Sequence, residues 1–538
     1  MKRSILGLFL LALMAATPTT AVRAERTRPA LVVVLVVDQM RADYLVRYGS
    51  LFEHGLMRLM SHGAWYQHAS YPYLSTFTCV GHTTIGTGAL PYRHGIIDNT
   101  WYDRQQQKTV TCTEDASTRE IAYGRYTGIG DSARNMRTPA LAELMRRQTH
   151  ARTAGLSLKA RAAISLVGHS ADAVTWFDDR GAWETSSAYA NSPLPWLSAL
   201  IEHHPVTVDA DKVWERSLPL DRYQGEDDAP GERGSGGWSR TFPHPLGAAS
   251  AQGFYLHWET SPYADAALEQ IAEGTVDALR LGQRKTDASD FLGVSFSALD
   301  YVGHAFGPRS HEVQDLLVHL DATIGRLLDH LDAKVGAGNY LVVLTADHGV
   351  ADLAEQRPGG GRIRAAAITD AINTALAPVL GQGPFAAATI ECDVFFKAGV
   401  YDRLKKNPAA MRTAIDAVQA VPGVARVLRG EQLMSAAARR SSDPQIRAAA
   451  LSYFAGRSGD LVIIPKEYWE ITPSATSHGS LYPYDQDVPL LFYGAGVPAG
   501  THQDAVSPVD IAPTLGAIVG VRLPAPDGHA LAVMRHAK

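Results

Sequence analysis

The sequence predicts an α/β fold, namely a doubly wound, mostly parallel sheet with helices on both faces. Unbroken apolar runs, such as ALVVVLVVD ending at Asp38, recur along the chain and are typical of strands buried on both faces. Segments with helical periodicity and recognisable caps separate these runs. Two stretches, at about 180–260 and about 353–475, interrupt this alternation, and we interpret them as insertions into one α/β unit.

The strand-like runs occur in a clear order. After the first run come FLGVSFSALD, which ends at Asp300, and YLVVLTADHG, which carries Asp347 and His348 at its end. The run VPLLFYGAG follows a loop that contains His478. We expect each run to be a buried strand of the same sheet.

Two predicted helices have clear start signals. In TPALAELMRR we expect Thr138 as N-cap and Pro139 at the first helical position. In SPVDIAPTLGAIVG the same roles fall to Ser507 and Pro508. The second insertion has its own predicted helices, AAAITDAINTAL and AAMRTAIDAVQAV, and strands, ECDVFFK and DLVIIP, so we expect a small cap subdomain there.

The bulk composition is that of an ordinary soluble globular protein. The 538 residues carry a formal net charge of -5, with 20% charged and 46% hydrophobic residues. A nucleic-acid-binding surface requires a basic stripe, which this mildly acidic chain does not offer. The composition therefore gives no indication of a nucleic acid as the main partner.

The N-terminus differs from the rest of the chain. MKRSILGLFLLALMAATPTTAVRAERTRP has a basic start, a short apolar run and a small-residue end, which is typical of a secretory signal peptide. We expect residues 1–24 to be cut off after Ala24, leaving residues 25–538 as a periplasmic or secreted monomer. A membrane anchor is the alternative, but the apolar run from Ile5 to Ala16 is too short to span a bilayer.

The chain has three cysteines, Cys79, Cys112 and Cys392. Three thiols exclude a four-cysteine zinc site. One disulfide bond is possible in an exported protein, and one thiol must then stay unpaired. Whether Cys112 pairs with Cys392 is open at this level.

Aspartates and histidines gather where strands are expected to end. Ligands bind at the carboxyl ends of strands in open α/β sheets, so the strand-end aspartates should converge. Carboxylate oxygens and imidazole nitrogens suit zinc, and six ligands are too many for one tetrahedral ion but fit two ions with open positions. The sequence therefore predicts two Zn²⁺ ions per chain, held by Asp38, Asp300, His304, Asp347, His348 and His478.

The segment TFTCVGHTTIGTG, with the residues before it, offers three possible nucleophiles: Thr76, Thr78 and Cys79. By intrinsic acidity the thiol would be the choice. Two adjacent zinc ions change that choice, because they lower the pKa of a hydroxyl group by several units and suit in-line displacement at phosphorus. A threonine can then act without a general base beside it.

The motifs taken together resemble the alkaline phosphatase superfamily, in particular its nucleotide pyrophosphatase/phosphodiesterase-like branch and the PafA-type alkaline phosphatases. The resemblance covers nearly the whole mature chain, from residue 31 to about 520. It is carried, in family order, by VVDQMRADYL, TFTCVGHTTIGTG, HGIIDNTWYD, SLKARAAI, DYVGHAFGP, TADHGV, SHGSLYPYDQDVPLLFYG and SPVDIAPTLGAIVG.

The resemblance implies roles for individual residues. Thr78 occupies the nucleophile position four residues before His82, and Cys79 becomes a small buried residue behind it. Asn99 falls on the asparagine that hydrogen-bonds a phosphoryl oxygen. One zinc ion would be held by Asp300, His304 and His478, and the other by Asp38, Asp347 and His348.

The pair Lys159 and Arg161 in SLKARAAI distinguishes the branches. In extended chain the two side chains would point to one face and could meet the terminal oxygens of a phosphate monoester. The resemblance thus implies an exported alkaline phosphatase of broad specificity that uses a phospho-threonine intermediate, with some activity on diesters. A phosphodiesterase or nucleotide pyrophosphatase of the same fold and an inactive metal-binding protein are the alternatives; a sulfatase is disfavoured because Cys79 lacks the C-x-P-x-R context.

Overall fold

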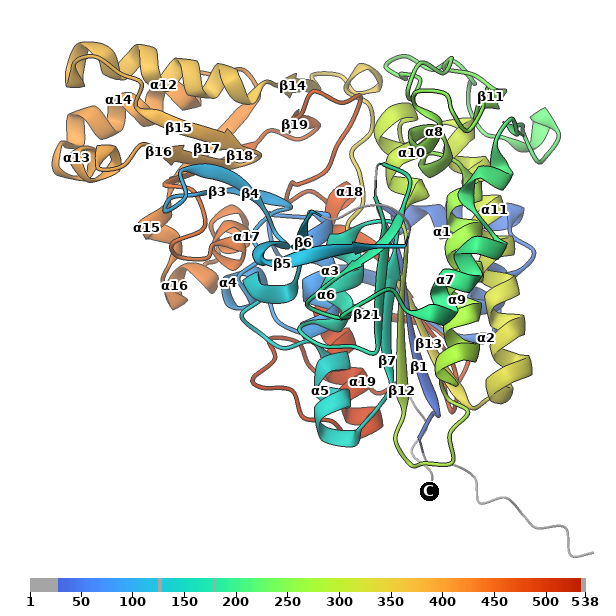
Figure 1. Ribbon diagram of the computed structural model, residues 1–538. Coiled ribbons are helices and arrows are strands. Elements are labelled where there is room, and N and C mark those ends of the chain that lie inside the picture. Colours follow the sequence, from blue (N-terminus) through green and yellow to red (C-terminus); the bar gives the residue numbers. More distant parts are fainter. Residues whose placement is uncertain (1–27, 124–127, 179, 534–538) are drawn as a thin grey trace, which may run out of the picture.

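The computed structural model describes residues 28–123, 128–178 and 180–533 (Figure 1). The predicted signal peptide, residues 1–24, lies outside the described residues. No described helix is both long enough and apolar enough to cross a membrane.

An eleven-stranded mixed sheet forms the centre of the molecule (Figure 1). Its strands are β1 (Leu31–Val37), β2 (Ala64–Ser70), β5 (Glu114–Ala122), β6 (Ile129–Asp131), β7 (Thr153–Ser157), β8 (Ala173–Phe177), β9 (Trp183–Ser186), β12 (Asp290–Phe296), β13 (Tyr340–Thr345), β20 (Asp487–Gly494) and β21 (Gly500–Val506). The spatial order is β21-β2-β20-β13-β1-β12-β7-β8-β9-β5-β6.

The middle of the sheet is parallel, as the sequence predicts. β1 lies between β12 and β13 and runs parallel to both, and β7 and β8 continue the parallel block. All seven residues of β1 are buried, which explains why its sequence is unbroken LVVVLVV rather than alternating. The run VPLLFYGAG also forms a strand, but β20 pairs antiparallel with β13 and β2, so its apolar run reflects burial and not a parallel partner.

Helices cover both faces of the sheet (Figure 1), which confirms the doubly wound class. One face carries α2 (Gly55–His62), α9 (Pro262–Leu279) and α11 (His311–Leu331), which pack on one another. The other carries α3 (Thr78–Thr87), α5 (Leu141–Thr149), α6 (Ala160–Val167) and α19 (Ile511–Val519). Shorter helices in the loops between the strands are α1 (Asp43–Arg47), α4 (Pro91–His94), α10 (Ala298–Phe306) and α18 (Pro483–Gln486).

The two predicted helix starts have different outcomes. Ser507 and Pro508 hold the predicted positions in a 3-10 turn, Pro508–Asp510, which leads directly into α19, so the helical segment starts where predicted but the α-helix itself starts three residues later, at Ile511. The signal at Thr138 is wrong by two positions, because the N-cap is Ala140, which is still extended, and α5 begins at Leu141. Thr138 and Pro139 therefore belong to the loop before the helix, and α5 has no side-chain cap at its N-terminus.

The two inserted stretches differ in regularity. The first holds α7 (Pro195–His203), β10 (Val213–Trp214), β11 (His244–Pro245) and α8 (Phe254–Glu259) between long irregular loops beside α10 and α11 (Figure 1). The second holds β14 (Gly361–Ile363), α12 (Ala365–Leu380), β15 (Ala386–Ile390), β16 (Asp393–Phe396), α13 (Val400–Lys406), α14 (Pro408–Gln419), β17 (Val424–Arg429), α15 (Gly430–Leu433), α16 (Ala436–Arg439), α17 (Pro444–Ser452), β18 (Leu461–Pro465) and β19 (Trp469–Ile471).

The second stretch has a hydrophobic core of its own. A cluster of buried side chains between Ile363 and Ile471 packs around the four-stranded sheet β15-β16-β18-β17, apart from the main core. The helices expected there correspond to α12 and α14, and the expected strands to β16 and β18. Leu74, four residues before Thr78, also belongs to this cluster, and its backbone N–H donates to Ser452 Oγ at 3.0 Å. The inserted unit therefore contacts the chain that leads into α3.

Candidate metal centre and active site

The first group of predicted ligands lies at the carboxyl ends of two neighbouring strands. Asp38 directly follows β1, while Asp347 and His348 follow β13, and all three side chains are fully buried. His348 Nε2 lies 3.5 Å from Asp38 Oδ1 and 3.3 Å from Asp347 Oδ2. Because β1 and β13 are parallel neighbours, their ends bring these residues together, as the sequence predicts. We call this set the buried triad.

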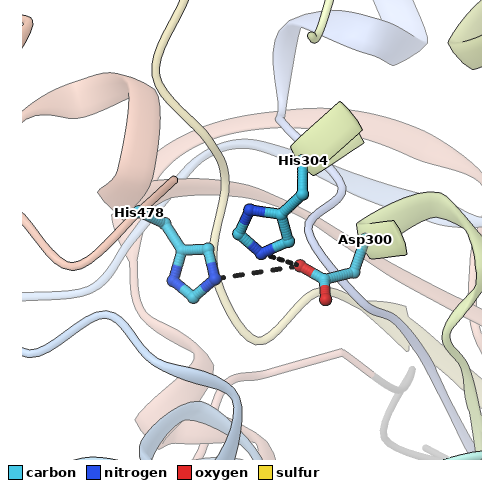
Figure 2. Close-up of side chains that lie close together, drawn as sticks. All are labelled: Asp300, His304 and His478. Atoms are coloured by element: carbon cyan, nitrogen blue, oxygen red, sulfur yellow. Dashed lines mark ion pairs between the residues drawn. The ribbon is translucent and has the colours of Figure 1, made fainter. Parts of the chain in front are cut away.

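The second group is assembled differently. Asp300 is not at a strand end: β12 stops at Phe296, and Asp300 lies in the first turn of α10, one turn before His304. His478 comes from the loop between β19 and α18. Figure 2 shows both imidazole rings pointing toward the Asp300 carboxylate, whose Oδ1 lies 3.2 Å from His304 Nε2 and 3.8 Å from His478 Nε2. We call this set the helix–loop triad.

All three histidines are oriented by a backbone carbonyl. A carbonyl oxygen can only accept, so each Nδ1 must carry the proton, and in the neutral ring each Nε2 must present its lone pair. This fixed tautomer is the usual arrangement for an imidazole that binds a metal. The pairs are His348 Nδ1 with Gly349 O at 2.9 Å, His304 Nδ1 with Thr476 O at 2.9 Å, and His478 Nδ1 with Thr76 O at 2.8 Å.

The two triads adjoin each other. The rings of His348 and His478 stack with centroids 3.5 Å apart. Gln39 links the two sets, since its backbone N–H donates to Asp347 Oδ1 at 3.1 Å and its side-chain amide donates to Asp300 Oδ1 at 2.6 Å. Sequence analysis did not single out Gln39. Its only signal is its position next to Asp38, together with a backbone φ of 67° that is uncommon outside glycine.

Charges in the centre perturb one another strongly. Burial and the charge of Asp347 raise the pKa of Asp38 well above its usual value. Burial opposes the ionisation of Asp300, but the Lys159 ammonium outweighs it and holds the pKa of Asp300 well below its usual value. Burial also opposes the charge on Lys159, yet Asp300 and Asp38 raise its pKa. The centre is therefore a place where positive charge is strongly stabilised.

The residues present fit two divalent metal ions. In each triad, one donor atom from each residue lies within 4.8 Å of the others. Asp38 Oδ1 and Asp347 Oδ2 are buried without a hydrogen bond from any described residue, although each faces the lone pair of His348. An unpaired buried carboxylate oxygen is costly unless a cation satisfies it. The buried triad offers two carboxylates and one imidazole, and the helix–loop triad offers one carboxylate and two imidazoles. Zinc accepts both donor sets.

A third acidic group does not support another metal site. Glu120, Asp178 and Glu184 also have oxygens within 4.8 Å of one another. Arg180 forms ion pairs with all three carboxylates, so its guanidinium group already compensates their negative charge.

Thr78 lies beside the buried triad. It is the first residue of α3, fully buried, with Oγ1 3.4 Å from His348 Nε2. His82, one turn later, bonds Thr78 O through Nδ1 at 2.8 Å and lies 3.2 Å from Asp347 Oδ2. Gly81 permits this approach, because a Cβ there would lie 2.1 Å from Asp347 O. The residues T-x-x-G-H thus fit α3 against the end of β13.

Lys159 and Arg161 are not in extended chain, contrary to the sequence expectation. Lys159 is the N-cap of α6, and Arg161 lies in the first turn of that helix. The helix start still places both side chains toward the centre. Lys159 Nζ donates to Asp38 Oδ2 at 2.5 Å and forms a very short contact with Asp300 Oδ2, so it bridges the two triads.

Lys159, Arg161 and Asn99 line one cleft of about 570 Å³. Asn99 Oδ1 accepts from the backbone N–H of Cys79 at 2.8 Å, so the amide NH2 is the end of this side chain that remains to donate. Arg161 Nε is buried without a hydrogen bond from any described residue. The cleft is also lined by the large side chains of Trp176, Phe177, Leu256 and Tyr301 and by the carboxylates of Asp131, Asp178, Glu184 and Glu259.

The cysteines depart from expectation. Cys79 is fully buried, as expected, but it is not merely a small packing residue, because it forms a disulfide bond with Cys112. Cys392 is a free, buried thiol in the inserted unit, so the open question of a Cys112–Cys392 pair is answered in the negative. Spacing alone could not choose among three possible pairs.

Comparison with known proteins agrees with this geometry. A family profile described as type I phosphodiesterase / nucleotide pyrophosphatase matches residues 32–486. The chain belongs to this family. Within it, the chain is 32% identical over 541 residues to alkaline phosphatase PafA of Elizabethkingia meningoseptica, covering 97% of each chain.

Two further relatives match this chain over a similar share of its length. Alkaline phosphatase PhoV of Synechococcus elongatus is 32% identical, over 92% of this chain and 91% of its own. A protein of Myroides odoratus named a calcium-transporting ATPase is 31% identical, over 92% of this chain and 93% of its own.

The crystal structure of wild-type PafA superposes with a TM-score of 0.85 at 30% identity, covering 94% of this chain and 99% of that one. A PafA variant with one threonine changed to serine, and one asparagine, one lysine and one arginine changed to alanine, superposes with a TM-score of 0.87.

Proposed function

We propose that this protein is an exported, zinc-dependent alkaline phosphatase that hydrolyses phosphate monoesters through a phospho-threonine intermediate. The observation that carries the proposal is the pair of adjoining triads with Thr78 Oγ1 3.4 Å from His348. The alkaline phosphatases among its relatives support the reaction class. The buried triad and the helix–loop triad would each hold one zinc ion.

The chain's own residues divide the reaction between them. Thr78 Oγ forms a bond to phosphorus while the bond from phosphorus to the alcohol oxygen breaks, and water later cleaves the phospho-threonine to regenerate Thr78 and release phosphate. His82 donates to the main-chain carbonyl oxygen of Thr78 and lies beside Asp347, so it helps to hold the first turn of α3 at the buried triad. Two bound zinc ions supply Lewis acidity, which lowers the pKa of a hydroxyl group and stabilises negative charge on oxygen.

The phosphoryl oxygens would be held by the cleft residues. Asn99 donates a neutral N–H, and Lys159 and Arg161 supply two positive charges near the same point. The PafA variant with substitutions at one threonine, one asparagine, one lysine and one arginine supports this choice, because those are the four residue types assigned here. A monoester dianion carries more charge on these oxygens than a diester, so the two cations favour monoesters.

A phosphodiesterase activity is the second candidate. The family name and the presence of Trp176, Phe177 and Leu256 in the cleft favour it, because a second ester group could pack against these side chains. In that case Lys159 and Arg161 would contribute equally to both substrates or not at all.

Matched kinetics decide between the two. The zinc-loaded protein is assayed on p-nitrophenyl phosphate and bis-p-nitrophenyl phosphate, with ATP included because one relative is named an ATPase. For Lys159→Ala with Arg161→Ala we expect kcat/KM for the monoester to fall about 10²-fold or more, since two charge-assisted hydrogen bonds are lost, and the diester rate to change far less. Equal losses on both esters would contradict the monoesterase assignment.

A surface control separates this effect from a general change in charge. Arg58→Ala removes a cation that pairs with Asp329 and Asp332 on the opposite side of the sheet, and it should leave both rates within about twofold.

The chain organisation completes the proposal. We propose a signal peptide over residues 1–24 and a catalytic domain over 25–538, with insertions at about 180–260 and about 353–475, the second forming a cap subdomain. The buried Cys79–Cys112 bond supports export, because disulfides persist in oxidising compartments. The exported form is proposed to be a monomer.

A further inference from the structure

The disulfide bond joins two segments that meet at the candidate active site. Cys79 immediately follows Thr78 on α3, and Cys112 follows the strand β4 (Lys108–Thr111) of a small hairpin. Both cysteines are buried, yet Cys112 lines the cleft that Asn99 and Lys159 also line. The bond therefore lies between the nucleophile helix and the wall of the substrate cleft.

Both cysteines also contact Asn99 directly. The backbone N–H of Cys79 donates to the side-chain oxygen of Asn99, and the backbone N–H of Cys112 donates to its main-chain oxygen, each at 2.8 Å. The two residues that the disulfide bond connects therefore hold Asn99 by hydrogen bonds to both of its oxygen atoms. With Oδ1 fixed, the orientation of the NH2 group is fixed as well.

The hairpin next to Asn99 does not extend to the nucleophile helix. Asn99 precedes the two-stranded hairpin of β3 (Thr100–Asp103) and β4, which forms a separate sheet from the central one. The hydrogen bond from Cys112 to Asn99 continues the ladder of this hairpin by one residue pair, and Asn135 donates to Cys112 O at 3.1 Å, but neither bond reaches α3. The disulfide bond and the hydrogen bond from Cys79 N–H to Asn99 Oδ1 tie this small hairpin to the helix that carries Thr78.

We propose that the Cys79–Cys112 disulfide bond is a positioning element, which fixes the amide of Asn99 relative to the hydroxyl of Thr78. The inference rests on the proposed function, because it assigns Asn99 to the phosphoryl oxygens. Neither sulfur atom contacts the reacting atoms in this role. The disulfide bond acts through Asn99, so its loss should lower only those rates and affinities to which Asn99 contributes.

The first test is whether the bond forms, and it needs no activity. The purified protein is unfolded and alkylated with and without prior reduction, and the labels are counted by mass spectrometry. We expect one label without reduction, on Cys392, and three after reduction. In Cys392→Ser the counts should be zero and two. Three labels on unreduced wild-type protein would overturn the proposal.

The second test removes the bond and asks whether the loss acts through Asn99. In the double variant Cys79→Ser with Cys112→Ser, kcat on p-nitrophenyl phosphate should fall about 10- to 100-fold, because a displacement of about 1 Å at a positioned group costs that much. Asn99→Ala should cost about 10²- to 10³-fold in the bridged protein and less than about tenfold in the bridge-free one. Equal costs in both backgrounds would show that the bond is only structural.

Two further arms keep the result decisive. Cys79→Ala with Cys112→Val offers an apolar replacement if the serine variant does not fold. If neither folds, the wild-type protein is reduced by a water-soluble phosphine, which takes up the oxygen of one water molecule and leaves two thiols. Activity should then fall in step with the thiol count and return on reoxidation; full activity at three thiols would overturn the proposal.

Failure of the proposed function is recognisable separately. In that case the zinc-loaded wild-type protein hydrolyses none of the esters, whatever the state of its cysteines. Inorganic phosphate binding, measured by calorimetry, then replaces the rates in the same Asn99→Ala comparison. Affinity losses that depend on the disulfide bond would support the positioning role, and independent losses would refute it.

Discussion

The two triads contain the same kinds of residue but are built in different ways. The buried triad comes from the ends of two adjacent parallel strands, and its three side chains have no exposed surface. The helix–loop triad combines one helical turn with a loop residue 174 positions away from His304, whose side chain is 27% exposed. The sheet therefore fixes the positions of the buried triad, whereas the helix–loop triad depends on the path of the loop that carries His478.

The electrostatics do not follow the same division. Burial lowers the pKa of His348 below its usual value, because desolvation disfavours the charged ring. Burial and the neighbouring imidazoles likewise hold the pKa of His478 well below its usual value, although His478 belongs to the helix–loop triad. Burial also opposes the charge on His304, but Asp300 outweighs it and raises the pKa. His304 is therefore the member that distinguishes the helix–loop triad, both in exposure and in charge.

The largest expected effect tests whether Thr78 belongs to the buried triad. Thr78→Ala should lower kcat on a monoester by about 10³-fold or more, because the covalent step loses its nucleophile. Zinc content, measured by mass spectrometry, should stay at two ions per chain, since both triads remain complete. Cys79 and Thr76 cannot substitute, because neither presents its group to His348.

Thr78→Ser provides the matched control, since it keeps the hydroxyl group and should retain most of the activity. A Thr78→Ala protein with near-wild-type turnover would remove Thr78 from the mechanism and, with it, the functional difference between the triads.

A smaller effect compares one histidine from each triad. His348→Ala should abolish binding of one zinc ion and lower kcat about 10³-fold, because no water can easily fill the dry gap beside Thr78. His304→Ala should be milder, at about 10- to 100-fold, since a water molecule can replace a ligand at a partly exposed position. Zinc content and kcat are measured for both.

The exposed His68 on β2 serves as the control, and His68→Ala should change neither quantity. If His304→Ala were the more damaging of the two variants, exposure would not be what distinguishes the triads.

The smallest effect concerns an ion network that holds the ligand-bearing segments together. Asp352, four residues after His348, binds Arg41 at 3.2 Å and Arg309 at 2.9 Å, as well as Arg357. Burial opposes the Asp352 charge, but these arginines lower its pKa to about 2. Arg41 follows Asp38, and Arg309 follows α10, so the network connects segments that carry residues of both triads.

Asp352→Asn should therefore lower the free energy of unfolding by about 2 kcal/mol at neutral pH. The folded-state pKa lies below the unfolded-state value, so this stabilisation is present above about pH 4 and is lost as the pH falls toward 2. Urea unfolding of both proteins at pH 7 and at descending pH checks this. A wild-type advantage that persists unchanged at pH 2 would contradict the ionic explanation.

Much of this architecture could be predicted from sequence because strand-end signals are local. The run LVVVLVVD gives both β1 and the position of Asp38, and the parallel packing of strands then fixes where the side chain points. The candidate ligand His304 was found because it lies four residues after Asp300, even though Asp300 was assigned to a strand end rather than to α10.

The remaining features depend on contacts that no local pattern records. Pairing of Cys79 with Cys112 depends on how the β3–β4 hairpin folds back to α3. The role of Gln39 as a link between triads appears only when Asp300 and Asp347 are side by side. The shared face expected for Lys159 and Arg161 assumed extended chain, whereas only Lys159, at the N-cap, is extended and Arg161 lies in the first turn of α6.

The carbonyl groups that orient the three histidines have a consequence for how the centre tolerates substitution. Thr76, Gly349 and Thr476 hold the rings through main-chain oxygen atoms alone. A change of the Thr76 or Thr476 side chain therefore leaves the acceptor of the corresponding ring in place. The orientation of each imidazole belongs to the path of the backbone, so it is inherited with the fold rather than with any one neighbouring side chain.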